Sequence, residues 1–96
     1  MSDNEPRFTV IDKSPEIERV QTGVRIEKNM LKVLKALAEY HDMTLGDLLE
    51  GIVLHVFEGK LPFGKDTMAK ISEMKKIYQM EYGAEMSHKL HEKSNF

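Results

Sequence analysis

The spacing of hydrophobic and polar residues is first regular in the segment RVQTGVRIE. There Val20, Thr22, Val24 and Ile26 alternate with residues that are polar or glycine. A period of two with β-branched residues on one side is typical of a half-buried strand. The pattern therefore predicts a short strand that begins at Arg19 and presents one apolar face.

Helical spacing follows from about Lys28 to His41. Apolar residues recur there at i, i+3, i+4, i+7 and i+8, which places them on one face of a helix. Lys32, Lys35 and Glu39 fall on the opposite face. The apolar residues are Met30, Val33, Leu34, Leu37 and Ala38.

A second helix is predicted after Thr44, because threonine is a preferred N-cap residue. We expect it to end at Gly59, and Pro62 prevents its continuation. Leu54 is apolar although it lies off the main stripe, so this helix is expected at the centre of the core. The stripe itself consists of Leu45, Leu48, Leu49, Ile52, Val53, Val56 and Phe57.

A third helical segment is predicted from Asp66 or Thr67, after a linker over residues 59–66. Two roles stay open for residues 67–96, which contain four methionines. They could pack on the core, or they could bind a protein partner through an adaptable methionine-rich surface. The stripe residues are Met68, Ile71, Met74, Tyr78 and Tyr82, and Lys75 interrupts them.

A single strand cannot satisfy its own backbone hydrogen bonds, and about 40 residues seldom fold alone. The simplest partner is the same strand of a second copy, paired across a two-fold axis. We therefore expect a homodimer. Its core is predicted to contain Val20, Val24, Ile26, Leu34, Leu37, Leu48, Leu49, Ile52, Val53 and Val56.

The segment VQTGVRIEKNMLKVLKALAEYHDMTLGDLLEGIVLHVF resembles the ribbon-helix-helix family of the Arc, MetJ and CopG type. The shared features are the alternating strand, a helix opened by a charged pair, a polar turn, and a threonine before the second helix. The resemblance implies a mostly α fold with one short β-strand, forming an intertwined homodimer with a C-terminal helix. The core would span residues 18–58, after a flexible arm over residues 1–17.

In this family a two-stranded ribbon lies in the major groove of DNA. The resemblance implies that Arg19, Gln21, Gly23 and Arg25 face the base edges. Arginine can bond guanine with two hydrogen bonds and glutamine can do the same with adenine. The implied phosphate contacts are Lys28, Thr44, Leu45 and Gly46, since free amides at a helix start suit an anion.

The net charge of the chain neither indicates nor excludes DNA binding. The chain of 96 residues has a net charge of −2, so DNA contact must be local rather than made by a basic field. It has no cysteine, no membrane-length apolar run and no secretory pattern in its opening MSDNEPRF, so we expect a cytoplasmic protein.

The sequence gives little support for nucleotide binding, metal binding or catalysis. The stretch GKLPFGKDT has phosphate-loop spacing up to Asp66, but it follows a predicted helix rather than a strand. His88 and His91 are close in sequence to Glu85 and Glu92, although a solvated end is the simpler interpretation. We expect no metal, no cofactor and no enzymatic activity.

The sequence thus predicts a homodimeric, sequence-specific DNA-binding protein that acts as a transcriptional repressor. One alternative is an antitoxin whose residues 67–96 bind a toxin. Another is a protein-interaction module of the same kind that does not bind DNA, which the acidic balance and Gly23 favour.

Overall fold

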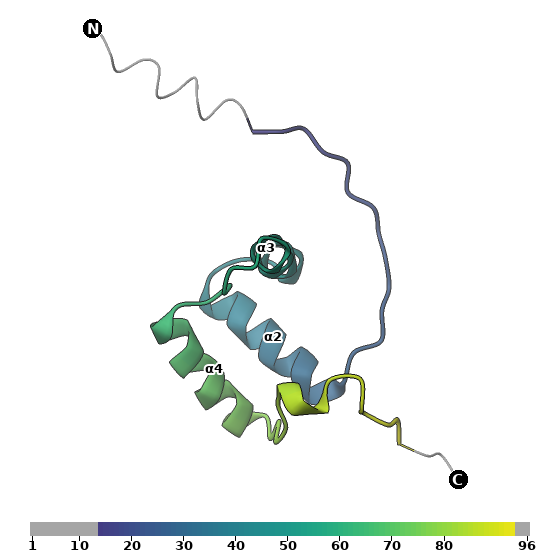
Figure 1. Cartoon of the computed structure of the whole chain (residues 1–96), viewed down its shortest axis with the longest axis vertical. Coiled ribbons are helices and arrows are strands. Elements are labelled where there is room, and N and C mark those ends of the chain that lie inside the picture. The colour runs from purple at the N-terminus through teal and green to yellow at the C-terminus, as the bar shows by residue number, and fades with distance from the viewer. Residues whose placement is uncertain (1–13, 94–96) are drawn as a thin grey trace, which may run out of the picture.

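A computed structural model describes residues 14–93 of the chain. These residues form the helices α2 (Lys28–Tyr40), α3 (Leu45–Phe57) and α4 (Lys65–Ile77), followed by the short 3-10 helix η1 (Ala84–Met86). α2 packs against both α3 and α4, so it is the central helix (Figure 1). The predicted ends of the first two helices and the predicted start of the third are therefore confirmed to within two residues, whereas α4 ends at Ile77, before Tyr78 and Tyr82 of the predicted stripe.

The starts of α2 and α3 are fixed by side chains. The Thr44 hydroxyl accepts a hydrogen bond from the backbone N–H of Asp47 at 3.1 Å, which confirms the predicted cap of α3. Glu27 is the N-cap residue of α2, and its carboxylate accepts hydrogen bonds from the N–H groups of Asn29 and Met30. Each cap satisfies donors that a helix start leaves unpaired.

The predicted stop at Gly59 is also confirmed. Gly59 has a φ of 71°, and its N–H donates to the carbonyl of Val56. The N–H of Lys60 donates to the carbonyl of His55, which completes a Schellman motif. This motif requires the left-handed backbone that glycine adopts without a steric penalty.

The core is thin and centres on α2. Leu37 is its most buried side chain, at 2% exposure. α4 contributes Met74 to this core, so the third helix packs on α2. The buried residues in the described part of the chain are Val33, Leu37, Ala38, Leu48 and Met74.

The predicted strand is wrong for the described residues. Residues 14–27, called the extended segment below, contain no strand and run as a long arc beside the helices (Figure 1). Within residues 14–93, positions 15–26 make no backbone–backbone hydrogen bond. A helix supplies its own hydrogen bonds, whereas a strand needs a second strand, and the described chain offers none.

The expected fold class must be corrected accordingly. A mostly α fold with one short β-strand, arranged as a ribbon-helix-helix homodimer, was expected, and residues 14–93 are instead all-helical apart from extended and turn backbone. The flexible arm expected over residues 1–17 lies outside the described residues as far as position 13.

Candidate interaction surface

The outer side of α3 is apolar and open to solvent. Its side chains are exposed by 43% at Val53, 65% at Leu54, 56% at Val56 and 82% at Phe57. These four residues form the α3 surface. α3 is hydrophobic around most of its circumference, yet α2 covers only the side that carries Leu48. Such a helix is normally buried on all sides, so the α3 surface is incomplete.

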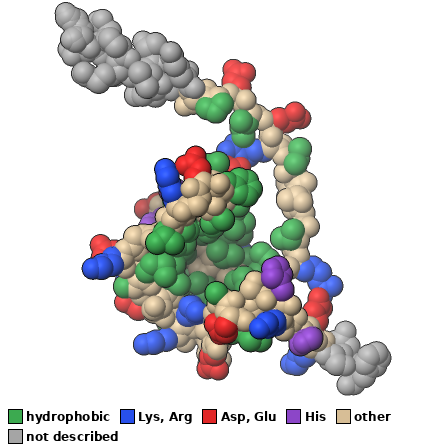
Figure 2. All heavy atoms as spheres, in the orientation of Figure 1, with side chains coloured by type: hydrophobic (Ala, Val, Ile, Leu, Met, Phe, Trp, Pro, Cys, Tyr) green, Lys and Arg blue, Asp and Glu red, His purple; other side chains and the backbone are tan. Residues whose placement is uncertain are grey.

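The extended segment continues this surface. Ile17, Val20 and Val24 are exposed by 61%, 79% and 75%. The segment and α3 form a shared groove, lined by Pro15, Ile17, Arg19, Leu49, Glu50, Val53 and Leu54. Figure 2 shows hydrophobic side chains gathered between α3 and α4, whereas those of the extended segment stand apart from this group. Contiguous apolar exposure of this kind marks an interaction site in a small protein.

The residues expected in the dimer core divide into two groups. One group lies inside the single chain, where Leu37 and Leu48 are buried and Ile26, Leu34, Leu49 and Ile52 are half-buried. The other group is exposed and comprises Val20, Val24, Val53 and Val56. The chain by itself therefore covers only part of the predicted apolar set.

Arg19 joins the extended segment to α3. Its Nε and Nη2 atoms donate to the two carboxylate oxygens of Glu50, both at 2.8 Å. This two-pronged hydrogen bond raises the pKa of the arginine and lowers the pKa of Glu50. Arg19 is thus held by a carboxylate, a partner that its sequence position does not indicate.

Arg25 is also bonded to a carboxylate, in this case one from the C-terminal part of the chain. Its Nη2 atom donates to Oε1 of Glu92 at 2.6 Å. Gln21 and Gly23, between the two arginines, are exposed and make no hydrogen bond within residues 14–93. Of the four residues expected to face DNA bases, two are therefore engaged by acids and two are open.

The residues expected to contact phosphate lie at different ends of α2. Lys28 is exposed at its first position, whereas Thr44, Leu45 and Gly46 follow its last turn. The helical rise separates these ends by about 20 Å. The amides of Leu45 and Gly46 make no hydrogen bond within the described residues. One chain therefore does not bring the phosphate candidates together.

A contact that the sequence did not predict joins the start of α2 to the C-terminal part of the chain. The hydroxyl of Tyr82 donates a short hydrogen bond to the same Glu27 carboxylate that caps α2. The pKa of Glu27 is lowered, first by Tyr82 and then by the backbone N–H of Asn29. Burial and this carboxylate raise the pKa of Tyr82 to about 12. The only sequence signal for this contact was an acidic residue immediately before a predicted helix.

No membrane-crossing helix is present among residues 14–93, because none is long and apolar enough. The same residues contain no group of three or more histidine, aspartate or glutamate side chains placed to hold a metal ion. In this structure His88 and His91 therefore do not form a ligand set with Glu85 and Glu92.

The fold and surface define a small all-helical chain with an uncovered apolar face. No family model, curated protein or solved structure matches the chain. Arguments about function therefore rest on its own residues and their geometry.

Proposed function

We propose that the chain works as a homodimeric DNA-binding protein and acts as a transcriptional repressor. The observation that carries this proposal is the exposure of the apolar side chains of the α3 surface, together with the groove that Ile17 of the extended segment shares with Val53 and Leu54. A second copy would cover the same surface on both molecules through one two-fold contact.

Dimerisation would leave polar side chains facing away from the contact. Gln21 and Arg25 are exposed on the extended segment, next to Val20 and Val24. A two-fold contact would present this glutamine and this arginine twice, related by symmetry. These are the side chains that make paired hydrogen bonds to guanine and adenine in the major groove.

The internal ion pairs favour a second candidate, an interaction module that does not bind DNA. Glu50 and Glu92 occupy the two arginines that would read bases. However, the paired side chains are exposed, by 84% at Arg25 and 73% at Glu92. Exposed ion pairs contribute about 0–1 kcal/mol, whereas a good paired contact to a base contributes about 1–3 kcal/mol. DNA can therefore displace the acids, and the repressor proposal is preferred.

The antitoxin alternative lacks a comparable observation. It requires residues 67–96 to be available for a toxin. Met74 of α4 is already buried against α2, and Tyr82 is bonded to Glu27. This packing supports a structural role for the region.

Titration of the protein against a mixed pool of DNA duplexes at low and moderate salt tests the proposal. We expect binding at low salt and a steep loss of affinity with added salt, because phosphate contacts release counterions. A mass measurement in the same buffers should give a dimer. A dimer that binds no duplex even at low salt would support the interaction module and exclude the repressor.

A further inference from the structure

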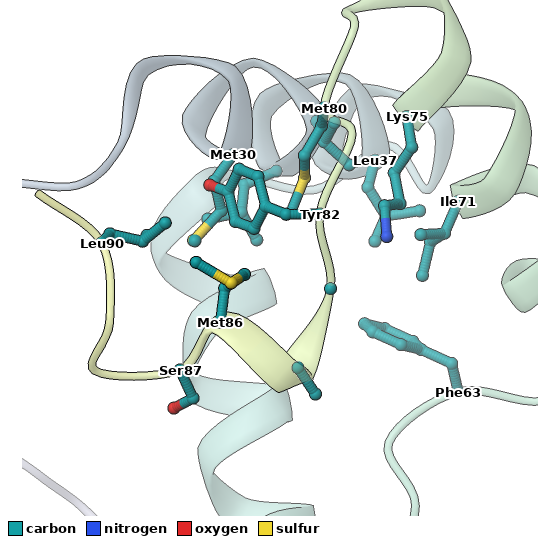
Figure 3. Close-up of a pocket in the computed structure, with 14 residues that line it drawn as sticks. Met30, Leu37, Phe63, Ile71, Lys75, Met80, Tyr82, Met86, Ser87 and Leu90 are labelled. Carbon is teal, nitrogen blue, oxygen red and sulfur yellow. The ribbon is translucent and has the colours of Figure 1, made fainter.

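A second apolar feature lies on the other side of α2, away from the α3 surface. It is a cavity of about 400 Å³ between α2, α4 and the C-terminal segment (residues 78–93) (Figure 3). This volume is within the range of small-molecule sites, about 300–1,000 Å³. The walls include Met30, Leu37, Ile71, Met80, Met86 and Leu90.

One cationic side chain enters this apolar space. Lys75 descends from α4, and its ammonium group lies between Leu37 and Ile71, opposite Phe63 (Figure 3). The side chain is half-buried. Within residues 14–93, its Nζ atom makes no hydrogen bond or ion pair. Its N–H donors are therefore available, and an anion placed there would gain a charge-assisted hydrogen bond.

The carboxylate of Glu85 interacts electrostatically with Lys75, but its hydrogen bonds are made with the backbone. Its carboxylate accepts a hydrogen bond from the N–H of Gly83 at 2.9 Å. The pKa of Glu85 is lowered first by backbone hydrogen bonds, and Lys75 adds a smaller electrostatic contribution. Glu85 therefore attracts Lys75 from a distance without occupying its three N–H donors.

We propose that this cavity binds a small aliphatic carboxylate, with the chain in the apolar space and the carboxylate on Lys75. The single cation suits a singly charged head group, since a phosphate would need more donors than one lysine offers. The three methionines of the lining, Met30 on α2 and Met80 and Met86 in the C-terminal segment, can adjust to an unbranched chain. This site is independent of DNA binding, because none of the residues expected to contact bases or phosphate lines it.

Decanoate and the neutral 1-decanol are suitable probes, because they share a chain and differ in the head group. Calorimetric titration of the full chain should show decanoate binding more tightly than decanol. Lys75→Met should weaken decanoate binding about tenfold, the loss expected for one charge-assisted hydrogen bond, and should leave decanol unchanged. Lys76→Met is the matched control, since Lys76 is the exposed neighbour and does not line the cavity.

Three results would overturn the proposal. The first is no decanoate binding by the folded parent protein, with circular dichroism confirming the helices. The second is equal decanoate affinity in the parent and in Lys75→Met. The third is decanoate binding that disappears as the protein self-associates at higher concentration. In that case a second copy of the chain would occupy the cavity. Decanoate binding that is selectively lost in Lys75→Met supports it.

Discussion

At the scale of single residues, Glu27 connects two parts of the chain. Its carboxylate caps α2 through Asn29 and Met30 and accepts the hydroxyl of Tyr82. One ionised group thus fixes the start of the central helix and attaches a segment that lies 55 positions later. All of these hydrogen bonds favour the charged carboxylate, which is why its pKa is lowered.

This residue predicts how stability depends on pH. The pKa of Glu27 is lowered from 4.5 on folding, so its contribution is present above pH 4.5 and is lost as the pH falls through the folded-state value. The pKa of Tyr82 is raised from 10.0 to about 12, so its contribution is present below pH 10 and is lost toward pH 12. Tyr82→Phe should lower the free energy of unfolding by about 1 kcal/mol at neutral pH. The same substitution should also reduce the loss of stability below pH 4.5 and the loss of stability above pH 10.

Urea denaturation at a series of pH values measures this effect. Tyr78→Phe is the control, because the hydroxyl of Tyr78 makes no hydrogen bond within residues 14–93. Parallel pH profiles for the parent and Tyr82→Phe would show that the bond to Glu27 does not contribute to stability.

At the scale of elements, α3 carries more apolar surface than one neighbour can cover. α2 packs against the side that contains Leu48, and the opposite side stays exposed. In the single chain, α3 is therefore supported by packing on one side only. The exposed side is where a second copy would gain most from association, since apolar burial is the main favourable term in most interfaces.

Leu54→Glu should therefore weaken the proposed dimer. Burying one leucine contributes about 1.5–3 kcal/mol, so the dimer dissociation constant should rise about ten- to hundredfold. Analytical ultracentrifugation over a concentration series measures it.

Ile77→Glu is the matched control for this variant. Ile77 is 68% exposed, close to the 65% of Leu54, but it lies on α4 outside the α3 surface. Equal weakening by the two substitutions would mean that the α3 surface is not the contact.

At the scale of the whole molecule, ion pairs connect parts that are distant in sequence. Arg19 is bonded to Glu50 and Arg25 to Glu92, across 31 and 67 positions. The first pair connects the extended segment to α3 and the second connects it to the C-terminal segment, and both occupy an arginine of the proposed DNA-reading face. DNA binding and these internal contacts would therefore compete for the same guanidinium groups.

Glu92→Gln should consequently strengthen DNA binding, by roughly two- to fivefold, because an exposed ion pair contributes at most about 1 kcal/mol. Arg25→Ala should weaken it by about 1–3 kcal/mol and relax sequence preference. Fluorescence anisotropy with one selected duplex at fixed salt compares the variants.

Glu58→Gln controls for the loss of a negative charge, since Glu58 pairs with Lys60 rather than with an arginine. If Glu58→Gln and Glu92→Gln strengthen DNA binding equally, Arg25 is not restrained by Glu92. Unchanged affinity in Arg25→Ala would remove this residue from the binding face.

The sequence by itself determined α2 and α3 with their ends, and the start of α4, because these depend on residues close together in the chain. Apolar spacing predicted α2 and α3, the hydroxyl of Thr44 predicted a cap, and Gly59 predicted a left-handed stop. Each of these interactions closes within about five residues, so its cause is visible in a short stretch.

Only the tertiary structure decided what lies beside these helices. The alternation over Arg19–Ile26 predicted a strand, but a strand exists only where a second one pairs with it, and the described chain supplies none. The partners of Arg25 and Tyr82, and the apolar space around Lys75, depend on segments brought together by packing of α4 on α2. Their sequence separation carries no local signal, since the contacts are set by burial of the shared core rather than by spacing.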